Sequence, residues 1–232
     1  MNSKLLIHLL AAREGLPWNP TVHGNTLLQH LNGRSVQMMR LISFFKQIPE
    51  FNELNVSDRI TLIKYNLMPL GILNCTLFYK NGLDQIQESE SDAPWDSKVF
   101  IHVHGQELYL KVKKVFESFV RIAQYDPRIV QLALIVLILT KGFSTNSTSD
   151  EPLLNDGIAV YRAQNYYSEL LWKYLEAVHG RQKAIQIFND LVTHFISWQM
   201  LQGELRASVH SKLTPTEIND LLPIMKSLLH IP

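Results

Sequence analysis

Residues Phe44–Leu54 read FFKQIPEFNEL, and residues Asp58–Lys64 soon after them read DRITLIK. Pro49 has no backbone N–H and restricts the residue before it, so it is a poor residue for the interior of a helix. A long apolar pattern at helical spacing, about Val22–Ile48, is therefore expected to end just before this proline. The first segment thus predicts the end of one helix and a tight connection to the next.

The next helix is expected to begin at the polar residues before the second segment. Asn55 or Ser57 is suited to the N-cap position, because either side chain can accept a hydrogen bond from a free backbone N–H of the first turn. The apolar pattern continues to about Tyr79, and Pro69 lies inside it, where it should bend the helix. These boundaries predict two long helices joined by a short connection.

Helical periodicity also dominates the rest of the chain, with Gly and Pro mostly between the periodic segments. One stretch, Val99–His104, is expected to be a strand that Gly105 closes. We see no internal repeat and no domain-length linker. A further helix is expected to start at Thr214, with this threonine as its cap and Glu217 at the third position. The remaining expected helices are Leu5–Leu10, Glu107–Ala123, Pro127–Leu139, Gly157–Val178, Gln182–Ser208 and Ile224–Leu229.

Composition excludes several classes of protein. The 22 Lys and Arg residues nearly balance the 21 Asp and Glu residues, so the chain lacks the basic excess that holds nucleic-acid phosphates. Cys75 is the only cysteine, which excludes an internal disulfide and a four-cysteine zinc module and is typical of a reducing compartment. The longest apolar run, Val130–Leu139, is about half of the roughly 20 residues that a spanning helix needs.

Residues that could carry chemistry form no catalytic pattern. His102 and His104 would share a face of the expected strand, as metal ligands often do, but no third ligand accompanies them. Cys75 lies among apolar residues, where burial raises a thiol pKa and lowers its reactivity. We find no phosphate-binding glycine loop, nucleophile elbow or paired carboxylates on one face. We therefore expect no enzyme, no catalytic residue, no metal site and no cofactor.

The two quoted segments resemble the signature of nuclear receptor ligand-binding domains, in which Lys precedes P-x-F-x-x-L and D-Q-x-x-L-L-K follows. Two positions depart from it: Phe45 replaces a small residue, and Arg59 replaces Gln. The resemblance extends over residues 1–232 and implies an all-α, three-layer antiparallel helical sandwich with a small β-hairpin. The DNA-binding domain of such a receptor would lie outside this chain.

The resemblance implies a surface groove for coregulator helices of the L-x-x-L-L kind, whose C-terminal carbonyls would meet Lys46. Ser227 stands where the final helix of the family carries glutamate, so partner docking should be weakened, unless Asp220 or Glu217 substitutes for that glutamate. The implied groove residues are Lys46, Ile48, Phe51, Ile60, Ile63, Lys64, Met225, Ser227 and Leu228.

The resemblance also implies a pocket for a small lipophilic ligand beneath that groove. Asn74 stands where several hormone-binding members carry an arginine that holds the ligand, whereas Arg34 could anchor an acid or could point outward. A core filled by its own side chains remains an alternative. The implied lining is His30, Leu31, Arg34, Met38, Met68, Gly71, Ile72, Asn74, Cys75, Phe100, Ile101, Leu201, Leu205 and Leu229.

The long helix Gln182–Ser208 resembles the dimerisation helix of the family. Its outward face, which we place near Asp190, Thr193, His194, Ser197 and Gln199, is less apolar than a strong homodimer interface. The resemblance implies a regulatory domain of a nuclear transcription factor, paired with a retinoid X receptor-type partner or with itself. The alternative is a ligand-independent module for dimerisation and corepressor binding.

Overall fold

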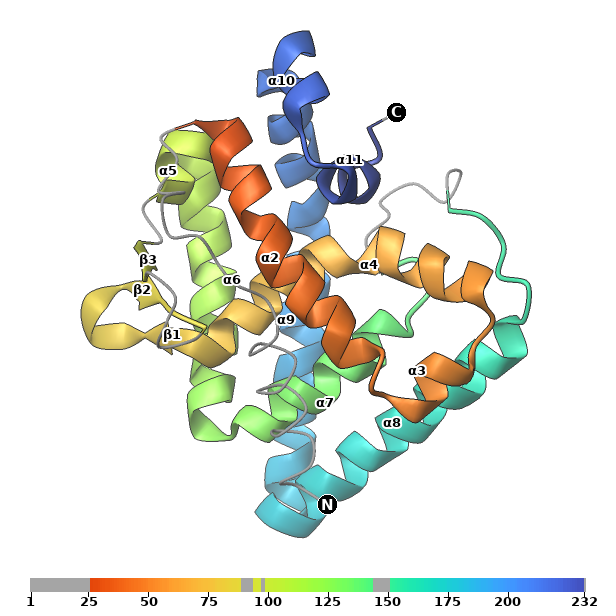
Figure 1. Cartoon of the computed structure of the whole chain (residues 1–232). Coiled ribbons are helices and arrows are strands. Elements are labelled where there is room, and N and C mark those ends of the chain that lie inside the picture. Colours follow the sequence, from red (N-terminus) through yellow and green to blue (C-terminus); the bar gives the residue numbers. More distant parts are fainter. Residues whose placement is uncertain (1–25, 89–93, 97–98, 144–150, 232) are drawn as a thin grey trace.

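The chain folds into a mostly helical structure with a small antiparallel sheet (Figure 1). A computed structural model describes residues 26–88, 94–96, 99–143 and 151–231. The expected helix at Leu5–Leu10 lies outside these residues. The predicted predominance of helix is confirmed, and the expected small β element is present, although at other residues than predicted.

The first two long helices have the connection that the sequence predicts. Helix α2 spans Leu27–Phe45, the short helix α3 spans Pro49–Glu53, and α4 spans Val56–Cys75. Asn55 caps α4, because its side chain accepts a hydrogen bond from the backbone of Asp58 at 2.9 Å. Helix α4 ends earlier than the expected Tyr79, where a short 3-10 helix, η1 (Thr76–Phe78), continues the chain.

Three two-residue strands form the sheet. Strand β1 (Tyr79–Lys80) pairs with β2 (Gln85–Ile86), and the 3-10 helix η2 (Asn81–Leu83) forms the turn between them. Strand β2 also pairs with β3 (Trp95–Asp96), so the order is β1-β2-β3 with both pairs antiparallel. The sheet projects from one side of the helices, next to α6 (Gln106–Tyr125) in Figure 1.

The strand expected at Val99–His104 is wrong, because these residues form helix α5. The segment fits both periods in part: residues 101–104 alternate between apolar and polar, whereas Phe100, Val103 and His104 share one helical face. Phe100 and Val103 are buried, and the rings of Phe100 and His104 lie 4.1 Å apart between centroids. Packing of α5 against α6 and the long helix α9 selects the helical period.

The remaining helices follow the sequence prediction closely. They are α6, already given, α7 (Pro127–Ile138), α8 (Gly157–His179), α9 (Arg181–Lys212), α10 (Pro215–Asp220) and α11 (Pro223–Leu229). Side chains of Asp126, Asp156 and Thr214 cap the starts of α7, α8 and α10. Thr214 and Glu217 form a reciprocal capping box, as their spacing predicts.

Helix α4 organises the core. It packs on α2 on one side and on α6, α7 and α9 on others, and Figure 1 shows α2 crossing in front of it. Leu62, Leu67 and Leu70 of α4 are fully buried, and each such side chain contributes roughly 1.5–3 kcal/mol by leaving water. Asn66 donates hydrogen bonds to the carbonyls of Ile138 (3.0 Å) and Thr140 (2.8 Å), which fixes α4 to the end of α7.

Asp58, from the second quoted segment, has a structural role. Its buried carboxylate accepts backbone N–H groups of Asn155 at 2.7 Å and Asp156 at 2.8 Å, and the side-chain amide of Asn55 at 3.0 Å. These bonds connect the start of α4 to the start of α8. Asp156, the N-cap of α8, is 98 residues after Asp58 in the sequence. The signature aspartate therefore fixes two helix N-termini together.

Candidate functional site

Two adjoining cavities lie between the helices, and each is partly open to solvent. The larger, of about 70 Å³, lies between α2, α4, α5, α9 and α11, and the smaller, of about 50 Å³, extends toward α6 and the sheet. Arg34 of α2, Ile72 of α4 and Phe100 of α5 line both cavities and therefore form the partition between them. Movement of these three side chains would join the two spaces.

Nine of the predicted pocket residues line these cavities. The larger cavity contains eight of them, His30, Leu31, Arg34, Met68, Ile72, Phe100, Leu205 and Leu229. The smaller cavity adds Cys75. These nine residues come from α2, α4, α5, α9 and α11, which meet at the two cavities.

Five predicted pocket residues line neither cavity: Met38, Gly71, Asn74, Ile101 and Leu201. Met38 is fully buried and packs over Gly71, where a Cβ would overlap the Met38 methyl group. The amide of Asn74 turns toward Glu88, with 3.5 Å between Nδ2 and Oε1. Ile101 follows Phe100 on a helix rather than a strand, and Leu201 packs in the core beside the cavity-lining face of α9.

Sequence reasoning missed several residues of the larger cavity: Tyr65, Pro69, His104, Gln202, Arg206, Val209 and Leu228. Helical spacing could have identified the α9 residues, since Gln202, Arg206 and Val209 lie three or four positions from Leu205 or from one another. The smaller cavity likewise contains Tyr109, Val112, Lys113 and Phe116 of α6, on one helical face. The signature gave no information on α6.

Charge in the larger cavity is one-sided. Its lining contains the guanidinium groups of Arg34 and Arg206 and no carboxylate. Burial lowers the pKa of His30 to about 3, and the Arg34 charge contributes to the shift. Burial also lowers the pKa of His104 to about 4, with the Lys212 and Arg34 charges as further causes. At neutral pH both imidazoles are therefore uncharged, and neither adds to the positive charge nor offsets it.

The orientation of Arg34, which the sequence left open, is inward. Its side chain is buried, with the residue 7% exposed, and it lines both cavities. Among the residues that the structure describes, its Nε and Nη2 atoms have no hydrogen-bond partner. Gly71 lies beside the guanidinium, since a Cβ there would be in ordinary contact with Arg34 Nη2 at 3.5 Å.

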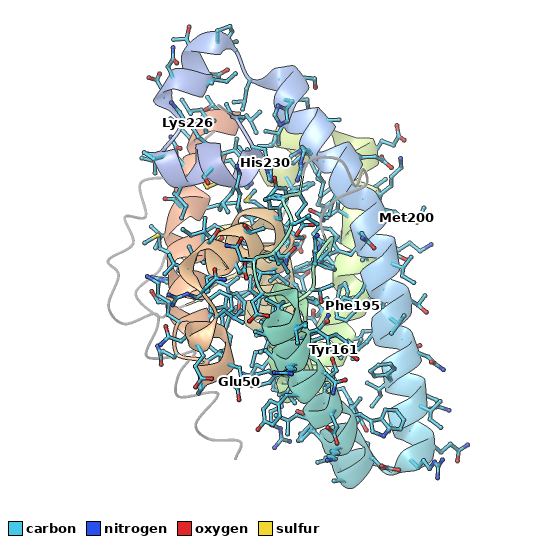
Figure 2. All side chains as sticks on the ribbon, turned by 90° about the vertical axis from the view of Figure 1, so that its right-hand side faces the viewer. Glu50, Tyr161, Phe195, Met200, Lys226 and His230 are labelled. Carbon is cyan, nitrogen blue, oxygen red and sulfur yellow. The ribbon has the colours of Figure 1, made fainter. Side chains whose placement is uncertain are left out.

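Helix α11 closes the larger cavity. Leu228 and Leu229 contribute to its lining, and α11 packs on α2 and α4. The ring of His230, just after α11, lies 4.4 Å from the ring of Tyr65, and His210 of α9 is 3.1 Å from the carbonyl of Leu229. Figure 2 shows α11, with Lys226 and His230, at the end of the helical bundle.

The predicted groove residues divide into accessible and buried sets. Lys46, Ile60 and Ser227 are exposed, and Ile63 and Lys64 are half-buried, so these five can meet a partner. The other four predicted groove residues, Ile48, Phe51, Met225 and Leu228, are core residues. Their assignment to the surface is corrected: apolar side chains on α3 and α11 turn inward, where they bury more area.

Exposed apolar residues occur on or beside the same elements as the accessible groove residues, and of these the sequence analysis selected Ile60 alone. Val56 and Ile60 of α4, Met39 of α2 and Leu222 before α11 are all more than 40% exposed, with Ile60 at 59%. Helices α2, α4 and α11 pack against one another.

The two acids considered as substitutes for a glutamate at Ser227 both lie on α10, the helix before α11. Glu217 Oε2 accepts the Thr214 N–H at 2.9 Å within the capping box of α10. Asp220 is the last residue of α10, and its carbonyl accepts a hydrogen bond from Asn32. Ser227 thus remains an exposed, uncharged residue of α11.

The outward face of α9 agrees with the prediction in part. Asp190 and Thr193 are exposed, as predicted, and Ser197 is half-buried. His194 packs its ring against Phe119, with 5.8 Å between centroids, and Gln199 donates to the Gly142 carbonyl at 3.1 Å, so both turn toward the bundle. The exposed side of α9 also carries an apolar row, and Figure 2 shows Met200 at the outer edge of the helix. The row consists of Ile185, Val192, Ile196 and Met200.

Other expected sites can be compared with the described residues only. No group of three or more metal-ligating side chains occurs among them. Residues 102 and 104 belong to a helix, so they lose the shared face that a strand would give them. Cys75 is buried.

Among the residues that the structure describes, no helix has the length and apolar character needed to cross a bilayer. Comparison of the sequence with models of known protein families gives no match.

Proposed function

We propose that this chain is the ligand-binding regulatory domain of a nuclear receptor transcription factor, acting in the nucleus. The signature at Phe44–Lys64, the order of the long helices and the central position of α4 support a three-layer helical sandwich. The domain would bind a small lipophilic ligand and coregulator helices. It would not contact DNA itself, because its charge is nearly balanced.

One observation carries this proposal: helix α11 lines the larger cavity with two of its residues and reaches the surface with another. Leu228 and Leu229 of α11 line the cavity, whereas Ser227 of the same helix is exposed. A molecule in the cavity would contact α11 and therefore shift the population in which this helix is packed on α2 and α4. Lys46 directly follows α2, and Lys64 lies on α4. Ligand occupancy would thus control the binding of a partner helix.

The accessible groove residues suit a partner helix of the L-x-x-L-L type. They are Lys46, Ile60, Ile63, Lys64 and Ser227. Lys46 follows the last residue of α2, and its charge would meet the carbonyl end of a partner helix. Ile60 and Ile63 would contact the partner leucines. Ser227 cannot provide the charged acceptor for the opposite end, so affinity should be low compared with a domain that carries glutamate there.

A second function is favoured by the size of the cavities. Volumes of about 70 Å³ and about 50 Å³ are small beside the roughly 300–1,000 Å³ typical of ligand pockets. A module with a filled core would dimerise and bind corepressors without a ligand. The apolar row on α9 could serve a retinoid X receptor-type partner or a second copy of this chain in either case.

Fluorescence anisotropy with a labelled L-x-x-L-L peptide tests the proposal. Lys46→Glu should weaken binding at least about 10-fold by placing a negative charge at the partner's carbonyl end. Lys173→Glu, on an exposed part of α8, is the matched control and should change little. If wild-type protein and the S227E variant both fail to bind the peptide saturably, the proposed function is wrong.

Native mass spectrometry of the purified chain separates the two functions. A co-purified hydrophobic molecule that leaves on denaturation supports the ligand-regulated domain. A stable chain with no bound molecule, which still binds peptide, supports the ligand-independent module.

A further inference from the structure

Arg34 provides an observation that the proposed function does not explain. An arginine stays charged in proteins, and transfer of an unpaired charge out of water costs several kcal/mol. Natural proteins therefore pair buried charges, yet Arg34 Nε and Nη2 have no partner among the described residues. The Nε–H and one Nη2–H point in the same direction from one edge of the planar guanidinium. This edge is the one that binds both oxygens of a carboxylate.

The surroundings of Arg34 provide no such carboxylate in the larger cavity. Its polar lining consists of two arginines, two histidines, Gln202 and the Tyr65 ring, whereas Asp84 and Glu117 line only the smaller cavity. Because burial keeps His30 and His104 neutral, these imidazoles can donate or accept hydrogen bonds beside an anion without a charge of their own. The cavity is thus lined by two positive charges, several neutral polar groups and apolar side chains, and by no carboxylate.

We propose that the larger cavity binds a lipophilic monocarboxylic acid, with the carboxylate on the Nε–Nη2 edge of Arg34 and the hydrocarbon chain against α11. The proposal rests on the proposed function and specifies its ligand class. The apolar lining toward the C-terminal end, Leu205, Val209, Leu228 and Leu229, would contact the chain. An acid is favoured over a neutral sterol because a carboxylate both accepts from the two free donors and neutralises the buried guanidinium charge.

The size of the cavities restricts the shape of the acid. A space of about 70 Å³ cannot hold a rigid polycyclic ligand, whereas a short flexible chain can lie along α11 with its carboxylate at Arg34. Met68, which also lines the larger cavity, is unbranched and adapts easily to such a guest. We therefore expect medium-length, unbranched acids to bind better than bulky ones.

Isothermal titration and thermal shift with a series of saturated fatty acids, hexanoate to palmitate, test this inference against the matched alcohols. At least one acid should raise the melting temperature and bind about 10- to 100-fold more tightly than its alcohol, the ratio expected for charge-assisted hydrogen bonds. Arg34→Met should remove this preference. Because Met places an apolar chain in the cavity, the variant should fold and melt no lower than wild type without ligand.

Arg206→Met is the matched control, since it removes a guanidinium from the same cavity and should change the acid affinity less than about 3-fold. The inference is overturned if acids and alcohols bind equally, if R34M retains the preference for acids, or if no acid in the series binds. In each of these cases, peptide binding that depends on Lys46 would still support the proposed function, so the two failures are distinguishable.

Discussion

Asn32 and Leu222, which are 190 residues apart in the sequence, are joined by a hydrogen bond of 2.9 Å from the Leu222 N–H to Asn32 Oδ1. The other half of the same amide donates to the Asp220 carbonyl at 3.1 Å. One side chain on α2 therefore holds both backbone groups of the turn that leads into α11. The position of α11 over the larger cavity depends on this contact as well as on the burial of Met225 and Leu228.

Asn32→Ala should make local opening of α11 easier. Two exposed hydrogen bonds are worth about 1–2 kcal/mol together, so backbone amides of Lys226 and Ile231 should exchange hydrogen roughly 5- to 30-fold faster. Hydrogen-exchange mass spectrometry measures this. Asn52→Ala on α3 is the control. It removes an exposed hydrogen bond that Asn52 accepts from Arg59 of α4, and it should leave the exchange of α11 unchanged. Equal exchange in N32A and wild type would contradict the role of Asn32.

Ser227→Glu should strengthen the binding of an L-x-x-L-L peptide. The new carboxylate can accept charge-assisted hydrogen bonds from the free N–H groups at the start of the partner helix, worth about 1–3 kcal/mol, or roughly 5- to 150-fold in affinity. Anisotropy titration measures the change. Ser211→Glu, exposed on α9, controls for the added charge. An S227E variant with wild-type affinity would show that the serine does not limit partner binding.

Asp58→Asn should destabilise the whole domain. The buried carboxylate accepts two backbone N–H groups, and an amide offers only one acceptor oxygen, so one donor would lose its partner. We expect the free energy of unfolding to fall by about 2–3 kcal/mol, measured by urea denaturation. Asp190→Asn, at an exposed site on α9, should have almost no effect. An unchanged midpoint in D58N would refute this assignment.

Stability should decrease in acid because of His30 and His104. Their pKa values in the folded chain are about 3 and about 4, below the ordinary 6.5, so between pH 6.5 and 4 the unfolded chain binds protons that the folded chain does not. The free energy of unfolding should therefore fall as pH falls through this window. The H30Q/H104Q double variant should show a smaller fall than wild type, whereas parallel pH profiles would be inconsistent with neutral buried imidazoles.

Lysine on the apolar row of α9 should weaken association through this helix. Ile196 and Met200 are 54% and 70% exposed, and charges in the middle of an apolar interface oppose its desolvation. We expect the I196K/M200K variant to weaken self-association, or association with a retinoid X receptor-type partner, at least about 10-fold in sedimentation velocity. Gln186→Lys adds charge on another part of α9 and is the control. Unaltered association would place the interface elsewhere.

Local signals determined most of the secondary structure. Pro49 begins α3, the Asn55 and Thr214 caps begin α4 and α10, and apolar positions at helical spacing mark α6 to α9, because caps and proline act within a few residues of themselves. The strand prediction for Val99–His104 failed because residues 101–104 alternate as in a strand while residues 100, 103 and 104 also fit one helical face. Only contacts with α6 and α9 decide between the two.

The chemical character of the candidate site required the tertiary structure. The sequence placed Arg34 on a helix near the expected pocket, but its inward direction is seen only in the folded chain, where it is buried and lines both cavities. Likewise, no local pattern distinguishes an inward Phe51 or Met225 from a surface one. The sequence by itself therefore determined most of the helices, because caps and apolar spacing depend on neighbours along the chain. It also showed Ser227 at the position where the resembling family carries glutamate. The cavity, its unpaired charge and the exposed row on α9 were decided only by packing, because burial depends on residues far apart in the sequence.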